Sequence, residues 1–296
     1  MAAAGDLIER ERELGTLRRL ADEAAAGEGH LAIVEGPAGI GKSRLLAELR
    51  GHAAAAGTTV LAARGSELER EFGFGVVRQL LETVVADPAA GDLLSGAAAP
   101  AGAVLGAPQE GEEGGASFAV LHGLYWVVVN LAARRPVLLC VDDLQWSDRA
   151  SLRFVAYLAH RLEGLPVLLA CGLRSGERPD DPALLAEIER QPSLVVVRPG
   201  PLGEAAVAEV LRGRLGVEPG AGFAAAVHRG TGGNPLLLRQ LVAALADDAV
   251  PPDDAHAGQV AEIGPRAVSR AVLLRLARLD EAAADAARPV SSAIAS

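Results

Sequence analysis

Lysine is nearly missing from this chain of 296 residues, because 27 of its 28 basic residues are arginine and the single lysine is Lys42. Aromatic residues are scarce too, at 3%, so aliphatic side chains must build the core, as in helices packed on a sheet. The formal net charge is 28 − 38 = −10, which argues against binding nucleic acid along a basic surface. Any phosphate site must therefore be local.

Long apolar runs are absent as well. None approaches 18 residues, so the sequence predicts no membrane span, and the acidic segment 1–13 lacks the apolar stretch of a signal peptide. Only two cysteines occur, Cys140 and Cys171, both in apolar strand-like runs. They predict buried, reduced thiols rather than a disulfide, and with them a cytoplasmic protein. The six histidines show no metal-ligand spacing.

Apolar strand-like segments alternate with helical ones through the first two thirds of the chain. The predicted strands are 30–36, 58–65, 136–143, 165–174 and 193–202. Helical segments are predicted at 41–56, 75–86, 117–135, 149–162 and 182–190. Strands that are apolar on both faces and separated by helices predict an α/β fold, with a parallel sheet covered by helices on both sides.

Two regions depart from this alternation. Residues 87–117 are rich in Ala, Gly and Pro, and we interpret them as a flexible insertion. From residue 203 the strand signal disappears, and helices are predicted at 203–215, 219–229, 235–247 and 265–279, with a polar linker over 247–258. We therefore expect an α/β domain over 1–202, a small helical subdomain over 203–288 and a tail over 289–296.

The lysine stands in a motif. The segment GPAGIGKS fits the phosphate-binding loop G-x-x-x-x-G-K-[ST], and a predicted strand precedes it and a predicted helix follows it. The glycines let backbone N–H groups surround phosphate oxygens, and the lysine reaches the β and γ phosphates. A glycine-rich turn capping a helix is the alternative. The predicted nucleotide contacts are Gly36, Pro37, Ala38, Gly39, Ile40, Gly41, Lys42, Ser43 and Arg44.

The segment VLLCVDDLQWSD places two carboxylates after an apolar strand. Asp142 is expected to hold Mg²⁺ together with the Ser43 hydroxyl. Asp143 is expected to orient or deprotonate the attacking water. The alternative is that both acids merely cap a strand turn.

Three weaker signals accompany these motifs. Arg174 ends a strand, where it could contact the γ-phosphate or simply be solvated. Pro235 follows Asn234 at a predicted helix start, which could also be an ordinary proline start. Arg10 lies in a charged run upstream of the first strand, where a solvated charge is the alternative.

Together, these segments resemble the STAND class of P-loop NTPases. More narrowly, LIERERELGTL, GPAGIGKSRLL, VDDLQWSD, the strand ending at Arg174 and GGNPLLL are similar, in that order, to the ATPase module of large ATP-binding LuxR-type regulators related to MalT. The resemblance covers about residues 6–280. It implies an ASCE/AAA-like sheet in which the Arg174 strand lies between the Lys42-motif strand and the Asp142 strand.

The resemblance also implies a function. Arg10 approaches the adenine, Pro235 closes over the nucleotide, and ATP and ADP with Mg²⁺ drive a slow, signal-gated ATPase switch. In the ATP state the module is expected to associate with itself or with other domains of a longer regulator. This chain ends before the helix-turn-helix of such regulators, so we expect no nucleic-acid contact by it.

Alternatives stay open. Asp143 stands where many hydrolysing relatives have Glu, which leaves a nucleotide-binding scaffold without significant turnover. A P-loop phosphotransferase would need a basic acceptor pocket, and a replication-initiator-like ATPase would need a basic winged helix; neither is evident in the sequence.

Overall fold

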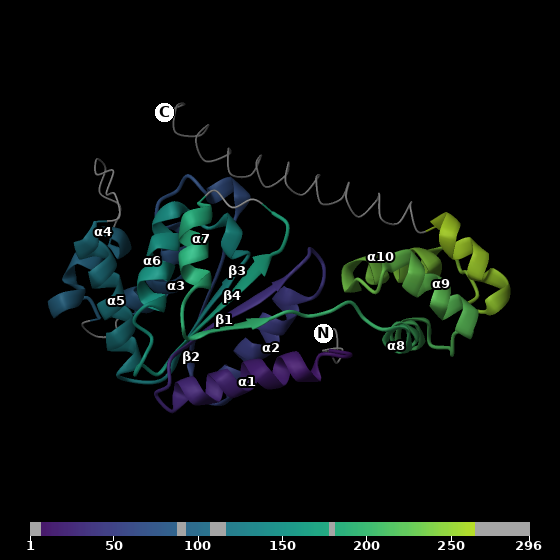
Figure 1. Ribbon diagram of the computed structural model, residues 1–296, viewed down its shortest axis with the longest axis horizontal. Helices are drawn as coiled ribbons and strands as arrows, with labels where there is room; N and C mark the ends of the chain where they lie inside the picture. Colours follow the sequence, from purple (N-terminus) through teal and green to yellow (C-terminus); the bar gives the residue numbers. More distant parts are fainter. Residues whose placement is uncertain (1–6, 88–92, 107–116, 178–180, 264–296) are drawn as a thin grey trace, which may run out of the picture. The chain divides into compact units, whose positions relative to one another are not determined.

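The computed structural model describes residues 7–87, 93–106, 117–177 and 181–263. The chain forms two compact units. The described residues of the larger unit lie within Arg10–Ala38 and Lys42–Pro199, and those of the smaller unit lie within Met1–Glu9, Gly39–Gly41 and Gly200–Ser296. The sheet lies in the larger unit, and the described part of the smaller unit is helical (Figure 1).

Five parallel strands run through the larger unit in the order β2-β3-β4-β1-β5. They are β1 (His30–Gly36), β2 (Thr59–Arg64), β3 (Val137–Asp142), β4 (Val167–Arg174) and β5 (Leu194–Val197). The prediction that the Arg174 strand lies between the other two motif strands is confirmed, since β4 lies between β1 and β3.

The register of the strands brings their last residues together. Gly36 of β1 pairs with Arg174 of β4, and Arg64 of β2 pairs with Asp142 of β3. Because the strands are parallel, all four residues lie at the carboxyl edge of the sheet, where open α/β sheets bind their ligands.

Helices cover both faces of the sheet, as predicted (Figure 1). On one side α1 (Glu11–Ala25) packs on α2 (Lys42–Ala55), and both contact the sheet. The helices that pack with one another on the other side are α3 (Gly75–Ala86), α5 (Phe118–Ala132), α6 (Arg149–Ala159) and α7 (Pro182–Glu189). Strands β3 and β4 are buried along their whole length except for their last residues.

The structure differs from the sequence prediction between residues 87 and 117. Residues Gly96–Ala101 form the 3₁₀ helix η3 and Gly102–Leu105 form α4, so the centre of the expected insertion is helical. Leu93, Ala98 and Ala101 are at most 1% exposed, and η3 packs on α5. Small alanine side chains carry this packing, which explains why the composition resembled that of a loop. Residues 88–92 and 107–116 lie outside the described residues.

Two smaller differences concern element limits. Strand β5 ends at Val197 rather than 202, where Pro199 and Pro201 cannot donate to a sheet ladder. Helix α1 was not among the predicted helices, because its charged, Arg- and Glu-rich face obscured the apolar positions Leu17 and Leu20, which are buried.

The smaller unit contains α8 (Glu204–Leu215), α9 (Ala221–Thr231), α10 (Pro235–Asp247) and the short η5 (Asp254–His256). These helices match three of the predicted segments and bury a core that includes Phe223, which is 0% exposed. The fourth predicted helix, 265–279, lies outside the described residues.

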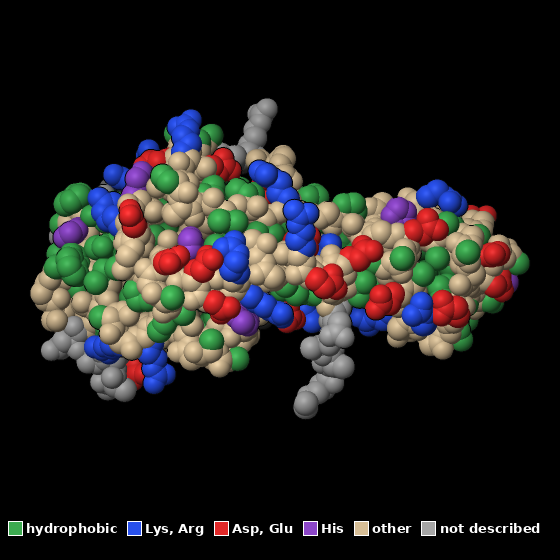
Figure 2. Space-filling view, turned by 60° about the horizontal axis from the view of Figure 1, so that its bottom comes forward, with side chains coloured by type: hydrophobic (Ala, Val, Ile, Leu, Met, Phe, Trp, Pro, Cys, Tyr) green, Lys and Arg blue, Asp and Glu red, His purple; other side chains and the backbone are tan. Residues whose placement is uncertain are grey.

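Charges of both signs are intermixed on the face of the molecule drawn in Figure 2, rather than gathered into a basic stripe. Within the described ranges, no helix combines the length and apolar character needed to cross a membrane. Cys140 and Cys171 are both buried free thiols, as predicted.

Candidate functional site

The loop between β1 and α2 carries the lysine motif. Its backbone is left-handed at Gly39 (φ 80°) and Gly41 (φ 109°), conformations that side chains rarely adopt. Helix α2 begins at Lys42 and has no acidic residue in its first turn. A turn of this shape, followed directly by a helix N-terminus, presents backbone N–H groups to an anion.

The Lys42 ammonium lies against this loop. Its Nζ donates to Gly36 O at 2.8 Å and to Pro37 O at 3.0 Å, and the residue is 6% exposed. Burial and the nearby charge of Arg174 lower the pKa of Lys42 from its usual value, against the opposite effects of Asp143 and Asp142. The ammonium thus belongs to the same electrostatic cluster as the residues after β3 and β4.

Asp142 ends β3 and is half-buried. Its Oδ1 accepts the Asp143 backbone N–H at 3.0 Å. The neighbouring strand makes room for this carboxylate, because a Cβ on Gly172 would lie 2.6 Å from Asp142 Oδ1. A glycine at that position of β4 is therefore part of the site.

Asp143 is held far more tightly than a surface acid. It is 3% exposed and has a left-handed backbone (φ 52°). Its Oδ2 accepts from Arg64 Nε at 3.1 Å and Nη2 at 2.8 Å. Its Oδ1 accepts from Arg174 Nε at 3.1 Å and from Gln145 Nε2 at 3.2 Å. Each oxygen has two lone pairs, so both oxygens are saturated.

The charge of Asp143 is stabilised by these partners. Burial alone would raise the pKa of the carboxyl group, but the hydrogen bond from Arg64, the charge of Arg174 and the hydrogen bond from Gln145 outweigh it and hold the pKa below its usual value. The carboxylate is therefore kept ionised.

Arg174 contacts several other side chains. Besides Asp143, its Nη1 donates to Glu177 at 2.9 Å, and its guanidinium lies 4.1 Å from the centre of the Trp146 ring. Its backbone N–H donates to Gln145 Oε1 at 3.1 Å. Its side chain is 10% exposed, so the alternative of a simply solvated charge is wrong.

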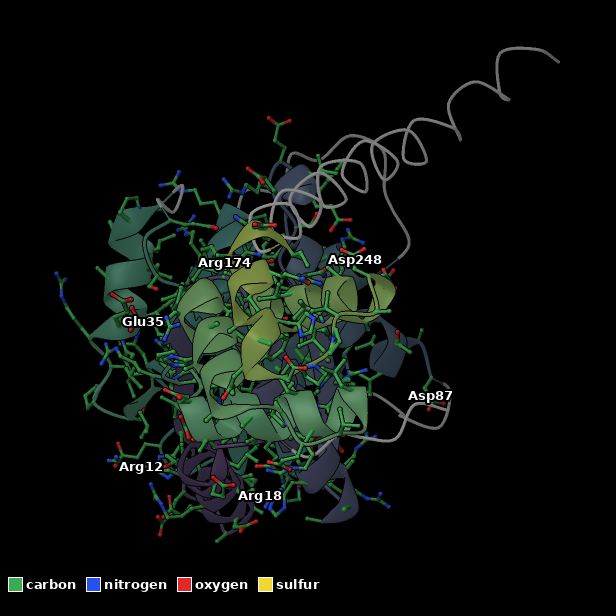
Figure 3. All side chains as sticks on the ribbon, turned by 90° about the vertical axis from the view of Figure 1, so that its right-hand side faces the viewer. Arg12, Arg18, Glu35, Asp87, Arg174 and Asp248 are labelled. Atoms are coloured by element: carbon green, nitrogen blue, oxygen red, sulfur yellow. The ribbon has the colours of Figure 1, made fainter. Side chains whose placement is uncertain are left out.

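The other predicted residues differ in setting. Ser43 and Arg44 are exposed at the start of α2, and Ile40 is buried. Arg10 precedes α1 and is 3% exposed, so it is not a solvated charge, unlike Arg12 and Arg18, which are exposed on the same helix (Figure 3).

Pro235 begins α10 in the smaller unit. The preceding Asn234 caps that helix, since its Oδ1 accepts the N–H groups of Leu236 and Leu237 at 3.0 and 3.4 Å. The proline and its cap thus account for a helix start without reference to a ligand.

A family model described as "AAA ATPase domain" matches residues 6–170. That span includes the glycine loop with Lys42, and Asp142 and Asp143. The chain belongs to the AAA ATPase domain family.

This AAA ATPase domain is similar to part of a longer curated protein. A curated protein of Rhizobium meliloti (strain 1021), "Uncharacterized protein R02095", is 30% identical over 189 residues, which cover 56% of this chain and 18% of that protein. The chain thus spans less than a fifth of the length of this curated relative.

The chain is also similar to solved structures. A chain of the E. coli MS115-1 HORMA:CdnC:Trip13 complex is 13% identical, with a TM-score of 0.51, covering 88% of this chain and 89% of that one. A STAND protein with a tetratricopeptide repeat sensor from Pyrococcus horikoshii is 15% identical, with a TM-score of 0.49, covering 81% of this chain and 30% of that one. The five-stranded parallel sheet and the family match give this AAA ATPase domain the fold of P-loop NTPases.

The residues of this AAA ATPase domain fit a nucleotide. The left-handed glycines, the ammonium of Lys42 and the acid-free first turn of α2 suit phosphate oxygens. Ser43 and Asp142 supply hydroxyl and carboxylate oxygens, the ligand type that Mg²⁺ prefers.

Sequence reasoning missed two side chains of this cluster. Arg64 ends β2, and Gln145 touches both Asp143 and Arg174. Trp146, for which the sequence favoured packing, lies against the Arg174 guanidinium. The only sequence signal for Arg64 was its position near the end of a predicted strand. In the structure that strand end lies at the same carboxyl edge of the sheet as Asp142.

Proposed function

We propose that this AAA ATPase domain is an ATP-binding switch that hydrolyses ATP slowly and serves a transcriptional regulator of the LuxR type. One observation carries the switch behaviour: both oxygens of the Asp143 carboxylate are saturated by hydrogen bonds. A general base needs a lone pair for the water that it activates. Hydrolysis must therefore wait until one of these contacts breaks.

In this proposal Lys42 and the loop Gly36, Pro37, Ala38, Gly39, Ile40, Gly41, Ser43 and Arg44 bind the phosphates. Ser43 and Asp142 hold Mg²⁺, which neutralises phosphate charge when bound. Arg174 exchanges Asp143 for the γ-phosphate, since guanidinium pairs strongly with either anion. That exchange frees Oδ1 of Asp143 in the ATP state only.

The remaining assignments rest on the resemblance to LuxR-type regulators. Arg10 contacts the adenine, and its burial supports a fixed position. On the same resemblance, Pro235 and the helical subdomain from residue 203 respond to the nucleotide. Self-association in the ATP state and a cytoplasmic location belong to the same proposal.

A second candidate follows from the same geometry. If the contacts of Asp143 never open, the chain is a nucleotide-binding scaffold without significant turnover. The two arginines that hold Asp143 favour this reading over a phosphotransferase, because they are paired with an acid rather than arranged around an acceptor.

Arg64→Gln separates the two candidates. Arg64 donates twice to Oδ2, so its loss opens two lone pairs without touching the phosphate loop. If its contacts restrain Asp143, Arg64→Gln should release phosphate about tenfold faster than the wild type in a single turnover, since a charged hydrogen bond is worth about 1.5–3 kcal/mol. ATP affinity should stay the same.

Arg18→Gln is the matched control, because Arg18 is an exposed arginine on α1. It should leave both quantities unchanged. ATP binding without measurable phosphate release in the wild-type chain and in Arg64→Gln would establish the scaffold, and absence of ATP binding would remove both candidates.

A further inference from the structure

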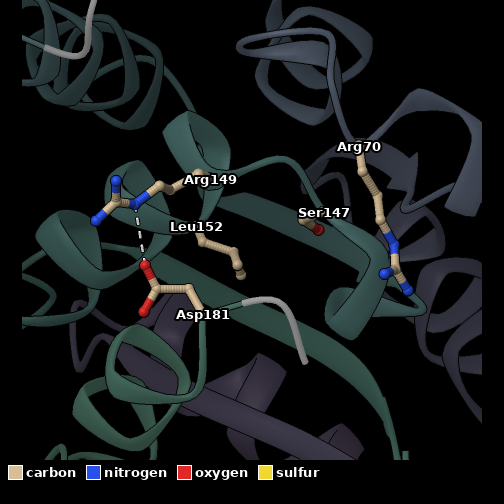
Figure 4. A pocket seen from close by; sticks show the side chains of 5 residues that line it. All are labelled: Arg70, Ser147, Arg149, Leu152 and Asp181. Atoms are coloured by element: carbon tan, nitrogen blue, oxygen red, sulfur yellow. Dashed lines mark hydrogen bonds and ion pairs between the residues drawn. The ribbon is translucent and has the colours of Figure 1, made fainter. Parts of the chain in front are cut away.

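A cavity of about 400 Å³ lies in the larger unit, lined by Arg70, Ser147, Arg149, Leu152 and Asp181 (Figure 4). None of these residues belongs to the phosphate loop or to the pairs around Asp143. Ser147 and Leu152 lie between Arg70 on one side and the Arg149–Asp181 pair on the other (Figure 4). The volume is that of a site for a small molecule.

Ser147 is the unusual member of this lining. It is 3% exposed, yet among the described residues its Oγ has no hydrogen-bond partner. Buried hydroxyl groups are nearly always hydrogen-bonded, because an unmet donor or acceptor is costly. Ser147 borders the cavity, so a rotation about its χ1 angle would let a ligand there supply the missing partner.

The chemistry of the lining indicates what kind of ligand this is. Two guanidinium groups and one carboxylate border the cavity. The carboxylate of Asp181 already accepts from Arg149 Nε at 3.0 Å. The side chain of Leu152, 1% exposed, adds an apolar wall. A hydroxyl donor with guanidinium groups suits a carboxylate or phosphate, and an apolar wall suits carbon.

We propose that this cavity binds a small organic anion, with its carboxylate or phosphate group on Ser147 and Arg70 and its carbon body against Leu152. Arg149 adds a second positive charge at the mouth, where its side chain is 80% exposed.

The cavity is joined to the Asp143 site by a short stretch of backbone. Ser147 N–H donates to Leu144 O at 3.0 Å, and Trp146 N–H donates to Asp143 O at 2.9 Å. A ligand that binds Ser147 therefore acts on the position of the turn that carries Asp143 and Gln145. This step rests on the proposed function: if the chain hydrolyses ATP, the bound anion is an effector of ATP turnover.

The test uses two fluorinated probes, para-fluorobenzoate and para-fluorophenyl phosphate, with the full chain and saturating Mg·ADP to occupy the phosphate loop. Fluorine NMR titration should show saturable binding of at least one probe. Arg70→Gln and Ser147→Ala should each weaken it about tenfold, whereas the control Arg18→Gln should leave it unchanged. Binding of one probe alone identifies the head group as a carboxylate or a phosphate.

Absence of saturable binding for both probes overturns the site. So does binding that both pocket variants leave intact, or that Arg18→Gln weakens equally. Two variants are used because Ser147→Ala alters a buried position, whereas Arg70 is only half-buried. Single-turnover phosphate release with and without the bound probe then tests the effector role: a change in wild type that Arg70→Gln abolishes supports it, and no change refutes it. The binding titration does not depend on turnover, so failure of the proposed function can be told apart from failure of the proposed anion site.

Discussion

Two loops at the carboxyl edge of the sheet, after β1 and after β3, are built in opposite ways. The loop after β1 depends on backbone: left-handed glycines, and a lysine whose described partners are the carbonyls of Gly36 and Pro37. The turn after β3 depends on side chains from three strand ends, with Asp143 between Arg64 and Arg174. The first is complete within eight residues, whereas the second needs partners 79 and 31 positions away.

This difference assigns separate roles. A backbone-built loop has its conformation set by local chain geometry and is ready for an anion before one arrives. A side-chain network has alternative pairings and can change partners at little cost in backbone geometry. The affinity of the loop after β1 for nucleotide should therefore be constant, while the rate of ATP turnover can be adjusted through the Asp143 network.

The largest expected effect separates the two carboxylates after β3. Asp143→Asn should lower single-turnover phosphate release by about 10²–10⁴-fold, the loss typical of a general base, and leave ATP affinity nearly unchanged. Asp142→Asn should instead weaken Mg²⁺-dependent binding. The exposed Asp87→Asn serves as the control. Unchanged turnover in Asp143→Asn would end its catalytic assignment.

Lys42→Ala tests the loop after β1. Loss of its charged contacts should weaken ATP binding by about 100-fold, because charged hydrogen bonds contribute about 1.5–3 kcal/mol each. Mg·ADP at 100 times the wild-type Kd should stabilise the wild type by about 2.7 kcal/mol and the variant hardly at all. Thermal unfolding with and without ligand measures both. A folded variant with wild-type affinity would contradict the phosphate-loop assignment.

Gly41→Ala tests whether backbone geometry alone is required. No atom within 4 Å would meet the new Cβ, and φ is 109°. We expect a loss of about 1–2 kcal/mol in the free energy of unfolding, purely from backbone strain. Gly51→Ala, in the interior of α2 and equally open, should gain about 0.5–1 kcal/mol. Equal effects of the two changes in urea unfolding would show that the left-handed turn is not required.

The smallest expected effect concerns recognition of the nucleotide base, which we assign to neither of the two loops. If Arg10 contacts adenine, GTP should stabilise the chain by about 1 kcal/mol less than ATP at equal concentration. Arg10→Gln should remove the difference. Equal thermal shifts for the two nucleotides in the wild type would remove the adenine assignment.

The same contrast explains how far the sequence could predict the molecule. The strands, their parallel arrangement and a glycine turn between a strand and a helix follow from local patterns, and they match the structure. The pairing of Asp143 with Arg64 does not follow from a local pattern. It depends on which strand lies beside β3 and on the Arg64 side chain, which is 64% exposed. Helix η3 was missed for another reason: its buried alanines are compositionally indistinguishable from those of a loop.

The two buried thiols have a practical consequence. Burial raises the pKa of Cys140 to about 12 and raises that of Cys171 as well. The thiolate is the reactive form, so neither thiol should react with maleimide dyes at neutral pH while the chain is folded. Cysteines introduced at exposed Arg18 and Asp248, one in each unit (Figure 3), should then take a donor and an acceptor dye without any native cysteine being removed. Energy transfer between them would report the separation of the units in each nucleotide state.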